Sequence, residues 1–390
     1  MTTLAAYDQV RWPRPACMVG LVAAIALVIP YVRGMFIDAG ARWLYVFLLA
    51  FTVAFALTPL MIQIGVAFGL VDHPSERKVH RAPVPRIGGI AVYLAFAGSV
   101  LVNSVLSSNM EAILIGGSLL LVIGVWDDAC ELPAWLKLVA QLAAAGLVIH
   151  AGIVLTLLPP THLGTAINVF LTLLWIVGIT NAFNFFDGMD GLATGLAMLM
   201  AFFMGLVASQ TDQPGLGWLA VAVIGACLGF FPYNFRLRKG TALVFLGDGG
   251  SFFLGFTLAC LAVKGNWADD NPIVSFSNPL LIFGVLIYDM IHITVERIVT
   301  GKVQSVREWI DYVGKDHLHH RLERLLGSKR ASVELIFALT TSLGLAAIVL
   351  RKADTMDAIL LLAQAALIVI MITIMEQHSR REGQDDGSDS

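Results

Sequence analysis

The chain has 390 residues, of which 57% are hydrophobic and only 14% are charged, and its formal net charge at pH 7 is -3. This composition excludes an ordinary water-soluble globular protein, in which about a quarter of the residues are charged. The slightly acidic balance also excludes the basic surface by which proteins bind nucleic acid non-specifically, so we expect a membrane protein with no nucleic-acid partner.

Apolar stretches along the chain predict membrane-spanning helices, because a helix needs about 20 apolar residues to cross a bilayer. Twelve candidates lie at about 17–32, 43–65, 88–106, 110–126, 134–152, 166–183, 190–208, 216–233, 250–265, 278–299, 333–350 and 357–376. The first follows Arg11 and Arg14 in the manner of a signal sequence, but no small-residue cleavage site follows it, and we interpret it as a retained span. The expected fold class is an all-α, polytopic membrane helix bundle of 11 to 12 transmembrane helices, of which one short segment could be re-entrant.

The predicted organisation has three parts: an N-terminal extension at 1–42, a main membrane domain at 43–376 and a disordered polar tail at 377–390. The tail ends in EGQDDGSDS, which offers no apolar side chain to bury. Loops of the main domain are expected at about 66–87, 127–133, 184–189, 234–249 and 300–332.

The lysines and arginines predict the orientation of the spans, since short loops rich in positive charge stay in the cytoplasm. With the N-terminus inside, 20 of the 25 basic residues lie on the inner side, 8 of them between Arg297 and Arg330. The predicted loops listed above then all face the cytoplasm.

Carboxylates gather at the predicted inner ends of the spans. An ionised side chain within the hydrocarbon costs about 2.5 to 3.5 kcal/mol and needs water, a counter-ion or a metal. The six inner acids are Asp127, Asp128, Glu131, Asp187, Asp190 and Asp248. Oxygen donors on one face of the membrane favour a hard divalent cation, Mg²⁺ or Mn²⁺, that carries phosphate groups.

Three further segments accompany the acids. The glycines of GDGGS, around Asp248, either form a simple turn or allow a phosphate to approach the start of the next helix. KDHLHHRL contains His317, His319 and His320, which could be zinc ligands or incidental members of a basic loop, although anion recognition suits the basic neighbours better. The loop VDHPSERKVHRAPVPRIGG supplies basic residues that either anchor the topology or contact a phosphate.

Taken in order, these segments resemble a known family. VDHPSERKVHRAPVPRIGG, VWDDACELPAWLKLVAQ, NAFNFFDGMDGLATG, FLGDGGSFFLG and KDHLHHRL together resemble the WecA branch of the polyprenyl-phosphate N-acetylhexosamine-1-phosphate transferase superfamily, to which the MraY enzymes are related. The resemblance covers about 43–376. It implies transfer of N-acetylhexosamine 1-phosphate, with N-acetylglucosamine favoured, from a UDP-sugar to polyprenyl phosphate in the bacterial inner membrane, with release of UMP, an active site facing the cytoplasm and Mg²⁺ or Mn²⁺ as cofactor. A homodimer and a place in lipopolysaccharide O-antigen or cell-wall synthesis are further expectations.

The resemblance also implies roles for single residues. By motif, the catalytic residues are Asp127, Asp128, Asp187 and Asp190, and the metal ligands are Asp248 and Asp127. The nucleotide contacts are Asn181, Asn184, Asp187, Asn234 and Phe245. The sugar and phosphate contacts are His317, His319, His320 and Arg321, and the lipid-phosphate contacts are Lys137, Lys78 and Arg81.

This sequence departs from the family pattern in three respects. Glu131 replaces the last aspartate of a DDxxD motif, Asn234 precedes Asp248 by 14 positions, and an extra span lies before residue 43. Transfer of a muramoyl-pentapeptide phosphate is the alternative reaction, and a secondary transporter is the alternative from another class. We expect a one-step displacement by the lipid phosphate, with a two-step route through an aspartyl intermediate as the alternative.

Overall fold

The computed structural model describes residues 15–73, 83–103, 107–235, 242–267, 272–305, 308–309, 312, 314, 316–350 and 354–385. It consists of two compact units, Met1–Gly265 and Asn266–Ser390, each with its own packing. The described residues are overwhelmingly helical, and their one strand pair is only two residues long on each side. The predicted all-α membrane fold class is therefore confirmed.

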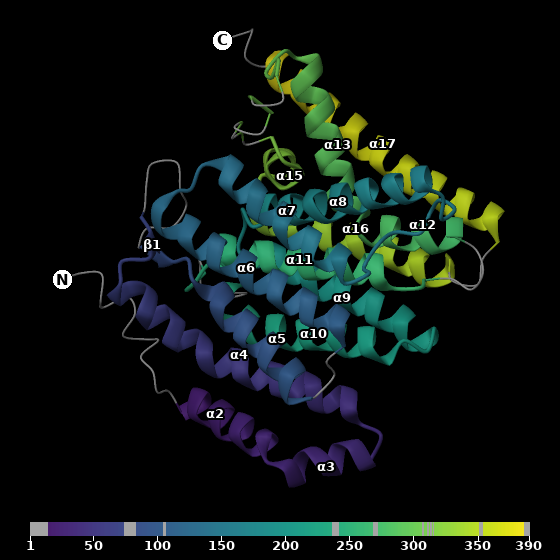
Figure 1. The fold of residues 1–390 in the computed structure, drawn as a ribbon. Helices are drawn as coiled ribbons and strands as arrows, with labels where there is room; N and C mark the ends of the chain where they lie inside the picture. Colours follow the sequence, from purple (N-terminus) through teal and green to yellow (C-terminus); the bar gives the residue numbers. More distant parts are fainter. Residues whose placement is uncertain are drawn as a thin grey trace. The chain divides into compact units, whose positions relative to one another are not determined.

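The first unit contains ten described α-helices and a short hairpin (Figure 1). The helices are α2 (Pro15–Val28), α3 (Pro30–Asp38), α4 (Arg42–Ala67), α5 (Gly88–Val102), α6 (Ser108–Cys130), α7 (Ala134–His150), α8 (His162–Phe185), α9 (Leu192–Gln210) and α10 (Pro214–Asn234), followed by a tenth, α11 (Gly247–Lys264). α4, α5 and α10 pack side by side, and α7 packs against both α6 and α8.

The helix α11 lies at the centre of the first unit. It packs against α5, α6, α8 and α9, and every residue from Gly249 to Val263 is buried. A helix that is apolar on all sides is stable only when it is surrounded, and here the surrounding atoms are those of neighbouring helices. The start of α11, with Asp248 in its first turn, is consequently held by protein on several sides.

A two-residue hairpin precedes α5. β1 (Val71–Asp72) pairs antiparallel with β2 (Val84–Pro85), and the Arg86 side chain forms an ion pair with Asp72. The backbone continues this pairing toward the start of α11, since Phe245 N–H donates to the Pro85 carbonyl at 2.8 Å and Gly89 N–H to the Leu246 carbonyl at 2.8 Å. The hairpin therefore holds the segment that leads into α11.

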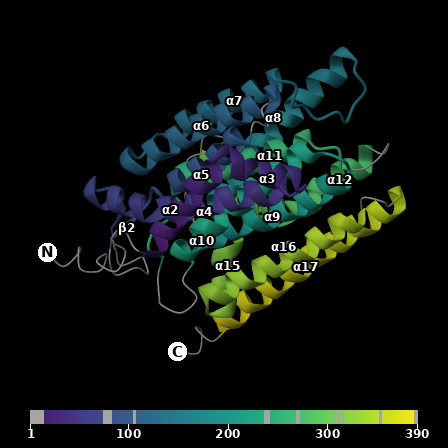
Figure 2. The ribbon, with the colours of Figure 1, turned by 90° about the horizontal axis from the view of Figure 1, so that it is seen from below.

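The second unit contains five described helices: α12 (Pro272–Ile282), α13 (Gly284–Val299), α15 (Leu318–Leu326), α16 (Lys329–Leu350) and α17 (Thr355–Asp385). α16 packs against α12, α13, α15 and α17. The long helices α16 and α17 run side by side in Figure 2. α12 and α13 are bent by 77° around Phe283.

Each of the twelve predicted spans coincides with a helix or a bent helix pair, but fewer qualify as spans by length and composition. Seven described helices do, or up to nine if the bent pairs α2 with α3 and α12 with α13 each count as one span. α5 and α7 are shorter, with 15 and 17 residues, and would reach only about 22 to 26 Å at 1.5 Å per residue. The predicted number of 11 to 12 is therefore higher than these criteria give.

The segment predicted as a polar tail begins within a helix. α17 continues to Asp385, so residues 377–385 lie in a helix, while 386–390 lie outside the described residues. The first turn is the unfavourable step of helix formation, and the apolar part of α17 has already formed it. Extending the helix is then easy through Glu376, Arg380 and Arg381, because these residue types favour helix.

Candidate active site

The predicted acids of the first unit meet where four helix ends converge. Asp127 and Asp128 lie in the last turn of α6, Asp187 and Asp190 in the turn between α8 and α9, and Asp248 in the first turn of α11. α11 packs against α6, α8 and α9, which brings these three segments together. Glu131, which follows α6 with a φ of 44°, is exposed.

Asp127 and Asp248 form the centre of this acid cluster. Their carboxyl groups lie close enough to influence each other's protonation. Asp127 is only 7% exposed; its Oδ2 accepts from Lys137 Nζ at 2.7 Å, and its Oδ1 accepts from the Leu132 N–H at 2.6 Å. The Lys137 ammonium group stabilises this pair of acids, and its side chain remains partly accessible.

Asp128 and Asp187 lie beside the backbone at the start of α11. Asp248 N–H donates to Asp128 Oδ2 at 2.9 Å, and the Gly247 backbone N–H lies near enough to the Asp187 carboxyl to influence its pKa. Gly247 has a φ of +76°, and a Cβ there would lie 2.6 Å from Asp128 Oδ2. Glycine is thus required both for this backbone conformation and for the close approach of the carboxylate.

The electrostatics of Asp187 reflect the crowding of acids. Burial raises the pKa of the Asp187 carboxyl well above its usual value, and the negative charges of Asp248 and Asp128 raise it further. The Gly247 N–H opposes this increase without reversing it. Such a cluster of like charges creates a strong attraction for a cation.

Two predicted asparagines on α8 have different surroundings. Asn184 Nδ2 donates to Asp248 Oδ1 at 2.9 Å and to Ser251 Oγ at 2.8 Å, so it orients the central acid. Asn181 lies one turn earlier and exchanges two amide hydrogen bonds with Gln141, at 3.1 and 2.6 Å. The structure therefore joins Asn184 to the acid cluster and joins Asn181 to α7.

The remaining predicted residues of this unit support the backbone. Asp190 Oδ2 accepts from the Ala242 N–H at 2.8 Å. Asn234 is buried; its Oδ1 accepts from the Gly191 N–H at 3.0 Å and its Nδ2 donates to the Val244 carbonyl at 3.0 Å. Phe245 contributes its backbone to the hairpin. Lys78 and Arg81, the predicted lipid-phosphate contacts, lie outside the described residues.

The acid cluster offers hard oxygen donors suited to Mg²⁺. Within the described residues, no group of three His, Cys, Asp or Glu side chains is arranged to hold a metal ion by itself. Mg²⁺, however, is commonly bound by one or two carboxylates, with substrate phosphates and water completing its coordination. The neighbouring carboxyl groups of Asp127 and Asp248 fit this requirement.

The predicted histidines lie in the second unit, at the start of α15. The rings of His317 and His319 are nearly parallel, with centroids 6.0 Å apart, and His320 lies 4.2 Å beyond His319. Burial lowers the pKa of the His319 imidazole well below its usual value, and the charges of His320 and His317 add to this effect. His319 is therefore held in its neutral form.

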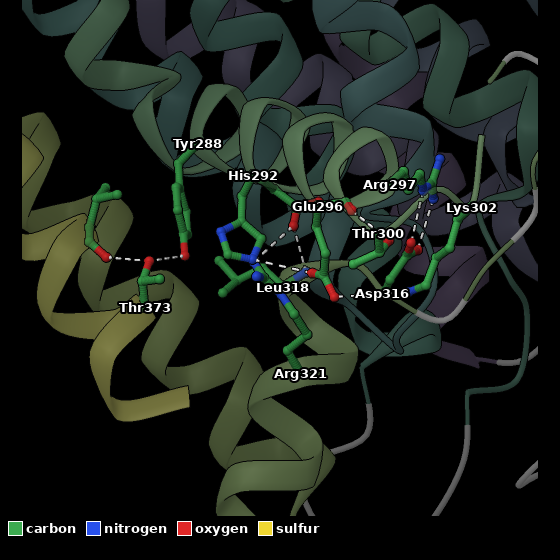
Figure 3. A network of polar contacts seen from close by, with 12 residues as sticks. Tyr288, His292, Glu296, Arg297, Thr300, Lys302, Asp316, Leu318, Arg321 and Thr373 are labelled. Carbon is green, nitrogen blue, oxygen red and sulfur yellow. Dashed lines mark hydrogen bonds and ion pairs between the residues drawn. The ribbon is translucent and has the colours of Figure 1, made fainter. Parts of the chain in front are cut away.

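Ion pairs tie this histidine segment to α13 (Figure 3). Arg297 donates to both oxygens of Asp316, each at 2.8 Å, and Arg321 NH2 lies 3.4 Å from Asp289 Oδ1. Burial alone would raise the pKa of Asp316, but the hydrogen bonds and charge of Arg297 lower it below its usual value.

Asp289 is a residue that sequence reasoning missed. It is fully buried; it accepts a hydrogen bond from the Leu318 N–H at 2.6 Å, and its Oδ2 lies 2.8 Å from His317 Nδ1. A signal was available, since Asp289 interrupts the apolar stretch VLIYDMIHI, and an acid within a predicted span usually has a functional role or a charged partner.

Comparisons with known proteins agree with this architecture. The model of glycosyl transferase family 4 matches residues 110–266, which include Asp127, Asp128, Asp187 and Asp248. The chain is 33% identical over 318 residues to a probable undecaprenyl-phosphate N-acetylglucosaminyl 1-phosphate transferase of Bacillus subtilis, covering 80% of this chain and 86% of that protein.

Two further relatives extend the similarity. A decaprenyl-phosphate N-acetylglucosaminephosphotransferase of Mycolicibacterium smegmatis is 30% identical over 364 residues. The match covers 84% of this chain and 87% of that protein. An undecaprenyl-phosphate alpha-N-acetylglucosaminyl 1-phosphate transferase of Yersinia pestis is 28% identical over 302 residues, covering 75% and 79%. The chain therefore belongs to glycosyl transferase family 4, among its polytopic membrane enzymes.

Proposed function

We propose that this protein transfers N-acetylglucosamine 1-phosphate from UDP-N-acetylglucosamine to a polyprenyl phosphate and releases UMP. The names of the relatives from Bacillus, Mycolicibacterium and Yersinia support the acceptor and the transferred group. The convergence of Asp127, Asp187 and Asp248 from separate helices is the structural observation that carries the proposal. A secondary transporter, the alternative from another class, has no support from these relatives.

In the proposed reaction, an oxygen of the lipid phosphate attacks the sugar-bearing phosphorus of the UDP-sugar. A new P–O bond forms there, and the bond from that phosphorus to the oxygen of UMP breaks, so UMP leaves with the electron pair. Phosphoryl transfer relies mainly on positioning and on stabilisation of charge. Asp127 or Asp128 would keep the attacking phosphate deprotonated. Little proton transfer is needed, because a phosphate monoester is already mostly ionised at pH 7.

Asp127 and Asp248 would hold Mg²⁺, with Mn²⁺ as an alternative ion. Such an ion supplies a positive charge that stabilises the phosphate oxygens as charge shifts between them. Asn184 orients Asp248 from α8, and the Asp248 N–H holds the carboxylate of Asp128. Lys137, held 2.7 Å from Asp127, places a cation beside the cluster for the lipid phosphate.

The other substrate contacts remain proposals from the family resemblance. Lys78 and Arg81 would contact the lipid phosphate, Asn181 and Phe245 the nucleotide, and the segment from His317 to Arg321 the sugar diphosphate. We propose that the enzyme acts at the cytoplasmic face of a bacterial inner membrane and starts a cell-envelope glycan. A muramoyl-pentapeptide substrate is the alternative to be tested within the same reaction class.

The direct test is an assay of protein purified in detergent with Mg²⁺, undecaprenyl phosphate and a panel of labelled UDP-sugars that includes UDP-N-acetylmuramoyl-pentapeptide. We expect a labelled lipid product and an equal amount of UMP from UDP-N-acetylglucosamine, and no product after chelation with EDTA. The absence of a lipid-linked product with every donor would refute the proposal. UMP exchange into UDP-sugar without any lipid acceptor would instead exclude the one-step route.

A matched pair of variants locates the chemistry. Asp248→Asn should lower turnover by at least about 100-fold, because it removes a charged ligand aimed at the reacting phosphates. Glu111→Gln makes the same change at an exposed acid in the first turn of α6, at the opposite end from Asp127, and should leave turnover unchanged. Retained activity in a folded Asp248→Asn protein would remove Asp248 from the mechanism.

A further inference from the structure

α13 holds the histidine segment through two neighbouring polar pairs. In one pair α13 supplies the acid, and in the other it supplies the base. Asp289 and Arg297 lie two turns apart on the buried face of α13. Asp289 pairs with His317. Figure 3 shows the second pair, in which Arg297 meets the neighbouring Asp316. Arg297 also lies 4.3 Å from the centre of the Tyr312 ring. The chain just before α15 is therefore fixed by one acid and one base of the same helix.

Asp289 makes the more specific of these two contacts. It is 0% exposed, and its two oxygens have different partners: Oδ1 accepts from the Leu318 N–H at 2.6 Å and faces Arg321 at 3.4 Å, while Oδ2 lies 2.8 Å from His317 Nδ1. A buried carboxylate beside a guanidinium group acts as an acceptor. His317 must then carry its hydrogen on Nδ1, which assigns the acceptor role of a neutral imidazole to Nε2.

We propose that Asp289 is a positioning residue, which fixes the tautomer and the ring orientation of His317 and, through the stacked rings, of the histidine segment. His317 and His319 are nearly parallel, with an angle of 12° between their planes, and His319 is only 1% exposed. Asp289 also holds the backbone between the two histidines, through the Leu318 N–H. The consequence for turnover rests on the proposed function, whereas the tautomer itself does not.

The tautomer provides a test that is independent of activity. Protein labelled with ¹⁵N-histidine in nanodiscs gives ring-nitrogen shifts that distinguish Nδ1–H from Nε2–H, and the His317 signal is the one lost in His317→Gln. We expect Nδ1–H in the wild type. A neutral His317 with hydrogen on Nε2 in the wild type would overturn the proposal before any Asp289 variant is made.

Asp289→Asn is the informative substitution. Its side-chain oxygen can still accept from the Leu318 N–H, but its amide group would present N–H to His317 Nδ1 and reverse the tautomer. We expect the hydrogen of His317 to move to Nε2 and kcat to fall by about 10- to 100-fold, the usual effect of removing a carboxylate that orients a functional histidine. Asp289→Glu, which keeps the charge, should retain Nδ1–H and recover part of the turnover.

Glu296→Gln is the matched control, an acid-to-amide change on the same helix at a residue that pairs with His292 and Lys302. It should change neither the tautomer nor kcat. An equal loss in both acid variants, with equal loss of thermal stability, would show that Asp289 has only a structural role.

A double-mutant cycle with His317→Gln completes the test. If Asp289 acts through His317, Asp289→Asn should cost little in the His317→Gln background. Additive losses would overturn the proposal. A wild-type protein with the expected tautomer but no transferase activity would refute the proposed function and leave the assignment of Asp289 intact.

Discussion

At the scale of single residues, Asn234 shows how a side chain in a family motif can serve the backbone. Its amide connects the start of α9 to the segment before α11, through the Gly191 N–H, the Thr194 hydroxyl at 3.1 Å and the Val244 carbonyl. These contacts give the Asn234 amide a structural role within the first unit. The nucleotide contact that the family resemblance implies for Asn234 stays a prediction, and the structure adds these backbone contacts to it.

Asn234→Ala should therefore reduce stability. The substitution leaves a buried N–H and a buried carbonyl without partners, at a cost of about 1 to 3 kcal/mol. A thermal unfolding assay in detergent should show a lower midpoint, and saturating UDP-sugar should still protect the folded protein. An unchanged midpoint with weaker UDP-sugar binding would instead support the predicted nucleotide contact.

His319 makes stability depend on pH. Its pKa is lowered in the folded protein, so below about pH 6.5 the unfolded chain binds a proton that the folded protein does not. Its contribution to stability is complete above that pH and decreases as the pH falls, by at most about 1.4 kcal/mol per unit. Asp316, whose folded pKa is also lowered, loses its contribution only below about pH 4.

The measurement is the unfolding midpoint of the wild type and of His319→Gln between pH 7.5 and 5. The wild-type midpoint should fall across this range, and the variant should show a weaker dependence. Parallel curves for the two proteins would contradict the assigned role of His319.

At the scale of elements, the position of Asp248 depends on the contact between α6 and α11. Gly124 of α6 lies against the first turn of α11, where an added Cβ would be 2.5 Å from the Asp248 carbonyl carbon. Helices approach this closely only where a side chain is missing. The apolar runs of the sequence predict both helices, but they give no sign of which glycine makes the contact.

Gly124→Ala should move the start of α11 and the Asp248 carboxylate with it. We expect a loss of about 1 to 3 kcal/mol from overpacking and a drop in kcat larger than any change in KM. Gly98→Ala in α5 is the matched control, since an added Cβ there meets nothing within 4 Å. Equal activity of both variants and the wild type would show that the contact tolerates a methyl group.

At the scale of the whole molecule, the predicted orientation places the acid cluster at the cytoplasmic face. The native cysteines allow a direct test, because Cys130 is exposed while Cys17, Cys227 and Cys260 are buried. Cys130 closes α6, two residues after Asp128, and therefore reports the side on which the acids lie.

A membrane-impermeant maleimide should label Cys130 in inside-out vesicles and leave it unlabelled in intact spheroplasts. Cys130→Ser should abolish the signal in the inside-out vesicles. Labelling from the outside of spheroplasts would reverse the topology that the lysines and arginines predict and would remove the cytoplasmic active site.

The sequence by itself determined the membrane environment, the fold class and the set of acids. Apolar runs, and the charged residues that interrupt them, can be read directly from the order of residues along the chain. The family motifs added the chemistry. Only the tertiary structure decided the partners of each acid, since Asp248 meets Asp128 across 120 positions and Asn184 across 64. Side chains distant in sequence become neighbours only through helix packing. Packing pairs Asn181 with Gln141, away from the acid cluster, and it brings Asp289 to His317.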